Sequence, residues 1–213
     1  MGLDRLRVAP VPLVPEIRLH LAEDPVVWWA RLEAEAGNVL EPPFWASAWV
    51  GGQAVARYVL DHPDVVAGRR VLDLASGSGL AAIAACRAGA ASVTANDIDP
   101  YAVAAIALNA EVNGVRVTAV GGDLLDGDGA PADVVLAGDV FYSRAMAERV
   151  AGLLDRVTAR GADFLIGDPG RAFLPRDRFE VMASYPAPAE GAFADAEISE
   201  VHVLRRSRPP ARQ

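Results

Sequence analysis

The stretch VLDLASGSG, from Val71 to Gly79, decides the fold. A short apolar run ends there in a glycine-rich turn, and the alanine-rich segment Ser78–Ala88 that follows has the pattern of a helix. Glycines let the backbone approach a ligand without a Cβ in the way, and the first turn of a helix presents unpaired N–H groups. We therefore expect a strand, a turn and a helix, with a small ligand lying over the turn.

Outward from this stretch, short apolar runs alternate with helical patterns from Gly68 onward. This alternation is typical of an α/β fold in which βα units surround a parallel sheet. The predicted parallel strands are Val71–Ala75, Val93–Asn96, Val115–Val120, Val134–Gly138 and Phe164–Gly167, and the predicted helices are Ser78–Ala88, Pro100–Asn113 and Ser143–Arg160. Phe179–Tyr185 and Ile198–Arg206 are expected to form an antiparallel hairpin that completes the sheet.

Signals at both ends define the helix over Pro100–Asn113. Asp99 is a suitable N-cap, proline suits the first helical position, and Gly114 follows the last turn. We assign Asn109 and Asn113 to the surface or the cap of this helix, not to a ligand site.

The chain of 213 residues is expected to form one domain core with additions at both ends. Residues 1–60 combine many prolines with all four tryptophans, and we interpret them as a helical or irregular N-terminal extension that covers the active site. Residues 61–206 form the predicted Rossmann-like core. Residues 207–213, which follow Arg205 and Arg206, continue a basic tail that we expect to be flexible.

Composition excludes several classes of function. The net charge of −8 argues against binding to nucleic acid, and the absence of lysine excludes Schiff-base chemistry. One cysteine and three scattered histidines offer no zinc-ligand spacing, so no metal is expected. Apolar stretches are shorter than the ~20 residues that span a bilayer, and Met1–Pro10 carries charges where a signal peptide is apolar. We expect a cytoplasmic protein, not bound to membranes, and a monomer.

The glycine-rich turn fits two kinds of cofactor. Gly77, Gly79 and Ala82 match the dinucleotide pattern, with Asp97 twenty residues after Gly77 at the position of a ribose-binding acid. Asp73, however, would repel a pyrophosphate and suits a cationic sulfonium. The sequence therefore favours S-adenosyl-L-methionine, and a dinucleotide-binding oxidoreductase is the alternative.

These residues resemble the first motif of class I methyltransferases. Asp73, Gly77 and Gly79 match that motif, and Ala75 stands where the family usually has its first glycine. The resemblance implies that Asp97 accepts hydrogen bonds from the ribose hydroxyls and that Ile98 lies against adenine. It also implies that the loop after the third strand binds the adenine amino group, through Asp123 with Leu124 beside it.

Further segments narrow the resemblance. PFWASAWVGGQA (residues 43–54), DVFY (residues 139–142) and PEIRLH (residues 15–20) resemble the seven-stranded lysine methyltransferases called methyltransferase family 16, especially bacterial relatives of the electron-transfer flavoprotein β-subunit lysine methyltransferases. Ribosomal protein L11 methyltransferases are also similar. The resemblance implies a sheet of order 3-2-1-4-5-7-6 with an antiparallel last strand. It places Trp49 and Ala137 near the cofactor, and Asp139 and Tyr142 at the methyl acceptor.

The negative charge of Asp139 favours a lysine as acceptor, and the resemblance implies that it belongs to a partner protein such as electron-transfer flavoprotein β-subunit or a ribosomal protein. Asp139 would anchor the ammonium group, while Tyr142 with Phe44 and Trp45 would form an aromatic pocket that favours the neutral amine. Neutralising a free lysine at pH 7 costs ~4.6 kcal/mol, because its pKa is ~10.4. Core packing is the alternative for Trp45, and a small-molecule N-methyltransferase is the alternative function.

Overall fold

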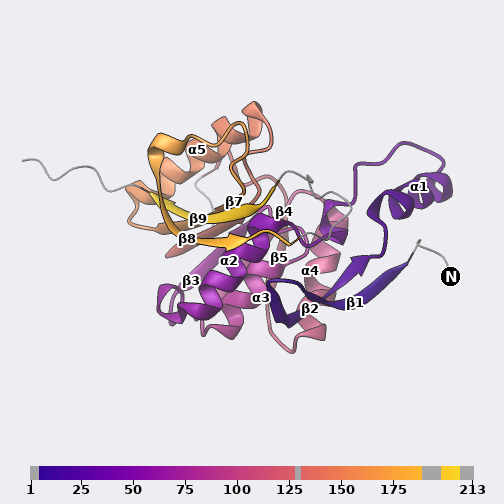
Figure 1. Ribbon diagram of the computed structural model, residues 1–213, viewed down its shortest axis with the longest axis horizontal. Helices are drawn as coiled ribbons and strands as arrows, with labels where there is room; N and C mark the ends of the chain where they lie inside the picture. The colour runs from indigo at the N-terminus through magenta and orange to yellow at the C-terminus, as the bar shows by residue number, and fades with distance from the viewer. Residues whose placement is uncertain (1–4, 128–130, 189–197, 207–213) are drawn as a thin grey trace, which may run out of the picture.

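The computed structural model describes residues 5–127, 131–188 and 198–206, so the predicted tail 207–213 lies outside the described residues. A seven-stranded sheet runs through the molecule with helices on both faces, and a smaller hairpin lies beside it (Figure 1). Within the described ranges, no helix is both long and apolar enough to cross a bilayer.

The large sheet has the strand order β5-β4-β3-β6-β7-β9-β8. The strands are β3 (Arg70–Leu74), β4 (Ser92–Asp97), β5 (Thr118–Gly121), β6 (Val134–Gly138), β7 (Asp163–Asp168), β8 (Phe179–Pro186) and β9 (Glu200–Arg206). The first five are parallel, and β9 runs antiparallel to both of its neighbours. The predicted order and antiparallel closure are confirmed. The strand predicted to start at Val115 begins only at Thr118.

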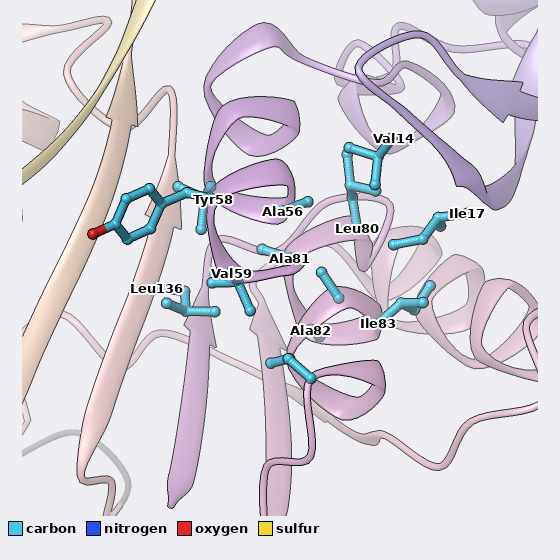
Figure 2. Close-up of a cluster of buried hydrophobic side chains, with 14 of the residues drawn as sticks. Val14, Ile17, Ala56, Tyr58, Val59, Leu80, Ala81, Ala82, Ile83 and Leu136 are labelled. Atoms are coloured by element: carbon cyan, nitrogen blue, oxygen red, sulfur yellow. The ribbon is translucent and has the colours of Figure 1, made fainter. Parts of the chain in front are cut away.

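Helices cover the two faces of this sheet. On one face, α2 (Val50–Asp61), α3 (Leu80–Arg87) and α4 (Pro100–Val112) contribute to one large buried cluster, part of which is shown in Figure 2. On the other face, α5 (Arg144–Ala159) packs its apolar residues against β6 and β7 in a second cluster. Short 3-10 turns lie at η1 (Phe44–Ala46), η2 (Pro63–Val65) and η3 (Arg176–Arg178).

The N-terminal extension is partly a β-hairpin, so its prediction as helical or irregular was wrong for this segment. β1 (Leu6–Val11) pairs with β2 (Val14–Ala22), and α1 (Pro25–Ala36) follows. The prolines suggested irregular backbone, but a two-stranded ribbon consists of edges, which tolerate proline. The alternation in β2, where Ile17 and Leu19 are fully buried, was the signal for a strand. The boundary predicted at residue 60 stays a prediction, and it falls inside α2.

Two asparagines of α4 attach this hairpin to the core. Asn113, the C-cap of α4, accepts a hydrogen bond from Arg18 N (3.1 Å) and donates one to Arg18 O (2.6 Å). Asn109 accepts from His20 N (2.8 Å) and donates to Ser78 O (2.8 Å). Asn109 is fully buried, so its assignment to the surface was wrong. The Asn109 side chain binds the backbone of β2 as a neighbouring strand would. No sequence pattern near Asn109 indicates this long-range contact.

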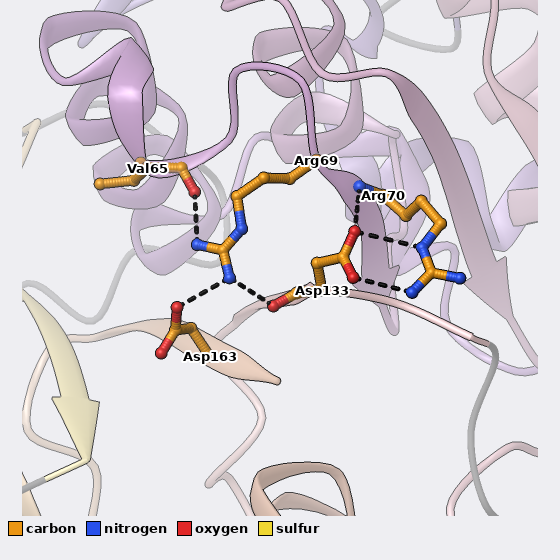
Figure 3. A network of polar contacts seen from close by, with 5 residues as sticks. All are labelled: Val65, Arg69, Arg70, Asp133 and Asp163. Carbon is orange, nitrogen blue, oxygen red and sulfur yellow. Dashed lines mark hydrogen bonds and ion pairs between the residues drawn. The ribbon is translucent and has the colours of Figure 1, made fainter. Parts of the chain in front are cut away.

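An arginine cluster joins the amino ends of β3, β6 and β7, at the edge of the sheet opposite the glycine-rich turn (Figure 3). Arg70 binds both carboxylate oxygens of Asp133, at 2.8 and 3.1 Å. Arg69 donates to Asp133 O and to the Asp163 carboxylate, both at 2.8 Å. Arg70 lowers the pKa of Asp133, which therefore stays ionised. The cluster fixes the strand ends by charge and geometry together.

Three glycines let the N-terminus of α2 touch the carboxyl ends of β6 and β7. A Cβ on Gly167 would lie 1.9 Å from Gly51 O, and one on Gly138 would lie 2.4 Å from Gly52 N. A Cβ on Gly51 would itself lie 2.3 Å from Gly167 O. A Cβ on any of Gly51, Gly138 or Gly167 would overlap backbone atoms, and we call this contact the glycine junction (Gly51, Gly138 and Gly167).

The junction predicts opposite effects for two Gly→Ala changes. Gly167→Ala should lower the free energy of unfolding by about 3 kcal/mol or more, because its Cβ overlaps backbone that cannot move aside. Gly52→Ala is the matched control: its Cβ meets nothing within 4 Å, and alanine favours a helix by ~0.5–1 kcal/mol. Urea unfolding measures both, and equal stabilities would contradict the junction.

Candidate active site

The loop between β3 and α3 is held in a tight, left-handed path. Ala75, Gly77 and Gly79 have φ of 50°, 54° and 84°. A Cβ on Gly79 would come within 3.4 Å of Ile106 in α4, so that helix packs directly against the turn. The predicted glycine-rich turn is therefore present at the carboxyl end of a central strand, where open α/β sheets bind ligands.

Asp73 lies beneath this turn and is 2% exposed. Its Oδ2 accepts hydrogen bonds from Ser76 Oγ (2.5 Å) and Ala82 N (3.0 Å). Burial raises the pKa of Asp73 to about 7, against the effect of these hydrogen bonds, and the charge of Asp97 contributes to the rise. The site thus contains a buried acid that titrates near neutrality and would gain from a nearby cation.

Asp97 ends β4 beside the same loop. Its Oδ2 accepts from Gly77 N (2.8 Å), and its Oδ1 accepts from Asp99 N (3.0 Å). Ile98, the next residue, is 71% exposed, so an uncovered apolar side chain adjoins a fixed carboxylate. Asp99 accepts from Tyr101 N and caps α4, which confirms that prediction.

The residues after β5 lie in a different environment. Asp123 accepts from Arg149 Nη2 (2.8 Å) and from Leu125 N (2.9 Å), so both of its oxygens have protein partners. Arg149 lowers the pKa of Asp123. Leu124 packs against the buried cluster on the α5 face. A contact between Asp123 and adenine stays a prediction. In such a contact the Asp123 carboxylate would bind the adenine amino group and Arg149 together.

The turn η1 lies against the loop between β3 and α3, which we call the glycine loop (residues 75–79). A Cβ on Gly77 would lie 3.9 Å from Trp45 Cα, and the Trp45 side chain is buried against Ala102 and Ala105 of α4. These contacts agree with the alternative interpretation of Trp45, in which it packs in the core. Phe44 points outward, half exposed, and its ring meets the edge of Trp49 at 5.7 Å between centroids.

Asp139 follows β6 with a left-handed backbone of φ 58° and is 8% exposed. Its Oδ2 accepts from Gly51 N (2.6 Å), which caps α2 from outside the helix. Its Oδ1 binds Arg171 Nη2 (2.6 Å), and the guanidinium lies 5.9 Å from the centre of the Trp49 ring. Burial raises the pKa of Asp139, and Arg171 opposes the rise.

The predicted residues therefore gather at one edge of the sheet in two adjoining groups. Asp73 and Asp97 accept hydrogen bonds from the glycine loop, through Ser76 and Gly77 respectively. Trp49 and Asp139 both contact the guanidinium of Arg171. Ala137 is buried in β6 next to β3, and Tyr142 is 61% exposed three residues after Asp139. In the described part of the chain, no three His, Cys, Asp or Glu side chains cluster as a metal site would require.

Sequence reasoning missed Arg171 and Asp168. Both follow the carboxyl end of β7, and Asp168-Pro169-Gly170 was recognised only as the point where the βα pattern ends. The available signal was topological: β7 is parallel to β6, so residues that follow both strands meet at the same edge.

A family model described as ribosomal protein L11 methyltransferase (PrmA) matches residues 57–163, half of the chain. The chain belongs to this methyltransferase family. It is similar to the electron transfer flavoprotein beta subunit lysine methyltransferase of Xenopus laevis, with 44% identity over 76% of this chain and 65% of that protein. The Caenorhabditis elegans homolog is 31% identical over 75% of this chain and 71% of that protein. The predicted resemblance to both groups is confirmed.

The fold agrees with this membership. The crystal structure of the ribosomal protein L11 methylase from Lactobacillus delbrueckii subsp. bulgaricus superposes with a TM-score of 0.51 and 21% identity, over 72% of this chain and 77% of that chain. Membership of a methyltransferase family favours S-adenosyl-L-methionine over the dinucleotide considered as the alternative. The chain spans just under two thirds of the length of its vertebrate relative.

Ala75 allows a test of the loop conformation. Ala75→Gly should change the free energy of unfolding by less than about 1 kcal/mol, because relief of left-handed strain is offset by backbone entropy. Ala75→Val should lower it by about 1–3 kcal/mol, since a β-branched residue resists positive φ. Urea unfolding of both variants is the measurement, and a valine variant as stable as the glycine variant would contradict the observed backbone.

Proposed function

We propose that this protein is an S-adenosyl-L-methionine-dependent methyltransferase that modifies a lysine side chain of a partner protein. The observation that carries the proposal is the pair formed by the Asp139 carboxylate and the Trp49 ring, which together hold an organic cation, the Arg171 guanidinium. A carboxylate beside an aromatic face is the combination that attracts an ammonium group. The similarity to lysine methyltransferases supports the same acceptor.

The described residues fit the proposed cofactor. The turn has positive φ at Gly77 and Gly79, where no Cβ atoms are present, and Ile98 offers an exposed apolar surface next to the Asp97 carboxylate. Asp97 would bind the ribose hydroxyls, Ile98 would face adenine, and Asp73 would balance the sulfonium charge. The bound cofactor supplies an activated methyl group, so the protein needs no covalent intermediate.

At the acceptor, the task of the chain is to align a neutral amine. Removing the proton of a free lysine at pH 7 costs ~4.6 kcal/mol, and an apolar surrounding lowers that cost because it disfavours the charged form. Phe44 and Tyr142 are exposed aromatic residues at this edge that could surround the alkyl chain. Asp139 is held by α2 and Arg171, so it acts as a fixed negative charge that orients the amine for in-line transfer.

The test is labelling of a proteome with tritiated S-adenosyl-L-methionine, followed by mass spectrometry of the labelled proteins. We expect methylated lysines on discrete proteins; electron transfer flavoprotein and ribosomal proteins are the first candidates, because the relatives are named for them. Label confined to small molecules would contradict a protein acceptor, and it would favour the small-molecule N-methyltransferase instead.

Substitutions separate the two halves of the site. Asp139→Asn should lower turnover on the order of 10²-fold through misalignment, while binding of S-adenosylhomocysteine is retained. Asp97→Ala should weaken that binding about tenfold or more, because a charged hydrogen-bond acceptor is lost. Asp64→Asn removes an exposed acid of η2 and is the charge control. Loss of cofactor binding in Asp139→Asn, with turnover retained, would reverse these roles.

Asp73 predicts a pH-dependent preference for a cationic ligand. Its pKa is raised to about 7, and a bound sulfonium would lower it, so binding would release a proton. The affinity for S-adenosyl-L-methionine should therefore rise between about pH 6 and about pH 8. Homocysteine-type sulfur is neutral, so the affinity for S-adenosylhomocysteine should rise less. Calorimetric titration at several pH values measures both.

Asp73→Asn is the control for this effect. The amide cannot ionise, so the two ligands should then show the same pH dependence. Identical slopes for both ligands in the unmodified protein would contradict the place proposed for Asp73.

A further inference from the structure

The loop that follows β7 is folded around the side chain of Asp168. This residue ends β7, pairs with His202 of β9 and is fully buried. Its Oδ1 accepts hydrogen bonds from Gly170 N and Arg171 N, both at 2.7 Å. Gly170 has φ of 90°, a conformation that favours glycine. The carboxylate and the glycine together fix the backbone at Arg171.

From this fixed backbone, the Arg171 side chain reaches the end of the neighbouring strand. Nη2 and Nε lie 2.6 and 3.3 Å from Asp139 Oδ1, and the guanidinium also lies over the Trp49 ring. Only 17% of the Arg171 side chain is exposed, so water screens this ion pair weakly. Arg171 therefore links three segments: the loop after β7, the turn after β6 and the residue that precedes α2.

Asp139 depends on such links because its own backbone does not place it in a regular strand. With φ of 58°, it leaves β6 in a left-handed conformation. One carboxylate oxygen is held by Gly51 N of α2 and the other by Arg171. The helix fixes one end of the carboxylate, and the guanidinium fixes its rotation.

We propose that Arg171 is a positioning residue that sets the Asp139 carboxylate for the methyl acceptor, and that Asp168 places Arg171 for this task. The inference rests on the proposed function, because it concerns the acceptor side of that site. Arg171 acts through Asp139, so its loss should lower kcat with little change in cofactor affinity. Misplacement of a reacting group by ~1 Å costs on the order of 10²-fold in rate.

Asp168 has a competing interpretation as a proton acceptor. No described residue donates a hydrogen bond to its Oδ2, and burial raises its pKa, with the Asp139 charge adding to the rise. Two variants distinguish these roles. Asp168→Asn keeps an oxygen for Gly170 N and Arg171 N but cannot take a proton, whereas Asp168→Ala loses both functions. The positioning role predicts activity in Asp168→Asn and a loss of at least tenfold in Asp168→Ala.

The experiment measures kcat, KM and S-adenosylhomocysteine affinity with the labelled partner protein, using the full chain. Arg171→Ala should lower kcat on the order of 10²-fold, and millimolar guanidinium should restore part of it by binding where the side chain was. Arg171→Lys should lie in between, because it keeps the charge without the planar fork. Arg176→Ala is the matched control: Arg176 binds Gly170 O in the same loop without contacting Asp139, and its loss should leave kcat within about twofold.

The outcomes separate this inference from the proposed function. Full kcat in Arg171→Ala, or equal losses in Asp168→Asn and Asp168→Ala, would overturn the positioning role while the unmodified protein still methylates lysine. Absence of lysine methylation by the unmodified protein would remove the proposed function and this inference with it. If Arg171→Ala does not fold, the Asp168 pair and Arg171→Lys decide the question, with thermal unfolding as the check on each variant.

Discussion

The contact of α2 with the carboxyl ends of β6 and β7 is the constraint on which the rest of the site depends. Gly51 and Gly167 touch through their backbones, so the first turn of α2 lies directly against the sheet. This approach brings the Gly51 N–H within reach of Asp139, and it sets Trp49 beside Arg171. A larger separation would leave the Asp139 carboxylate buried without its hydrogen bond from Gly51 N, and the acceptor side of the site would lose its geometry.

Burial of carboxylates is the common electrostatic theme of this edge. Asp73, Asp139 and Asp168 are each almost or completely inaccessible, and burial raises the pKa of all three. Only Arg171 supplies a side-chain cation to them among the described ion pairs. An edge with more buried acids than cations favours ligands that bring positive charge, as a sulfonium and an ammonium do.

Much of this arrangement could be predicted from the sequence, and the rest depends on contacts between distant segments. Asp73 and Asp97 were recognised because the strand, turn and capping signals around them are local. Arg171 lies 32 residues from Asp139, and nothing near either residue encodes their meeting. The hairpin β1-β2 was missed because its prolines outweighed a short alternation, and Asn109 was missed because its partners belong to β2 and to the glycine loop.

The arginine cluster at the amino ends of β3, β6 and β7 has a consequence for the proposed chemistry. Arg69 and Arg70 provide the cations there, and this sequence contains no lysine anywhere. A guanidinium keeps its proton at every physiological pH, whereas an ε-amine can lose one and become a nucleophile. The chain thus presents no side chain of the kind that it is proposed to modify. None of these 213 residues can therefore become a methyl-lysine, and the lysine proposed as acceptor lies outside them.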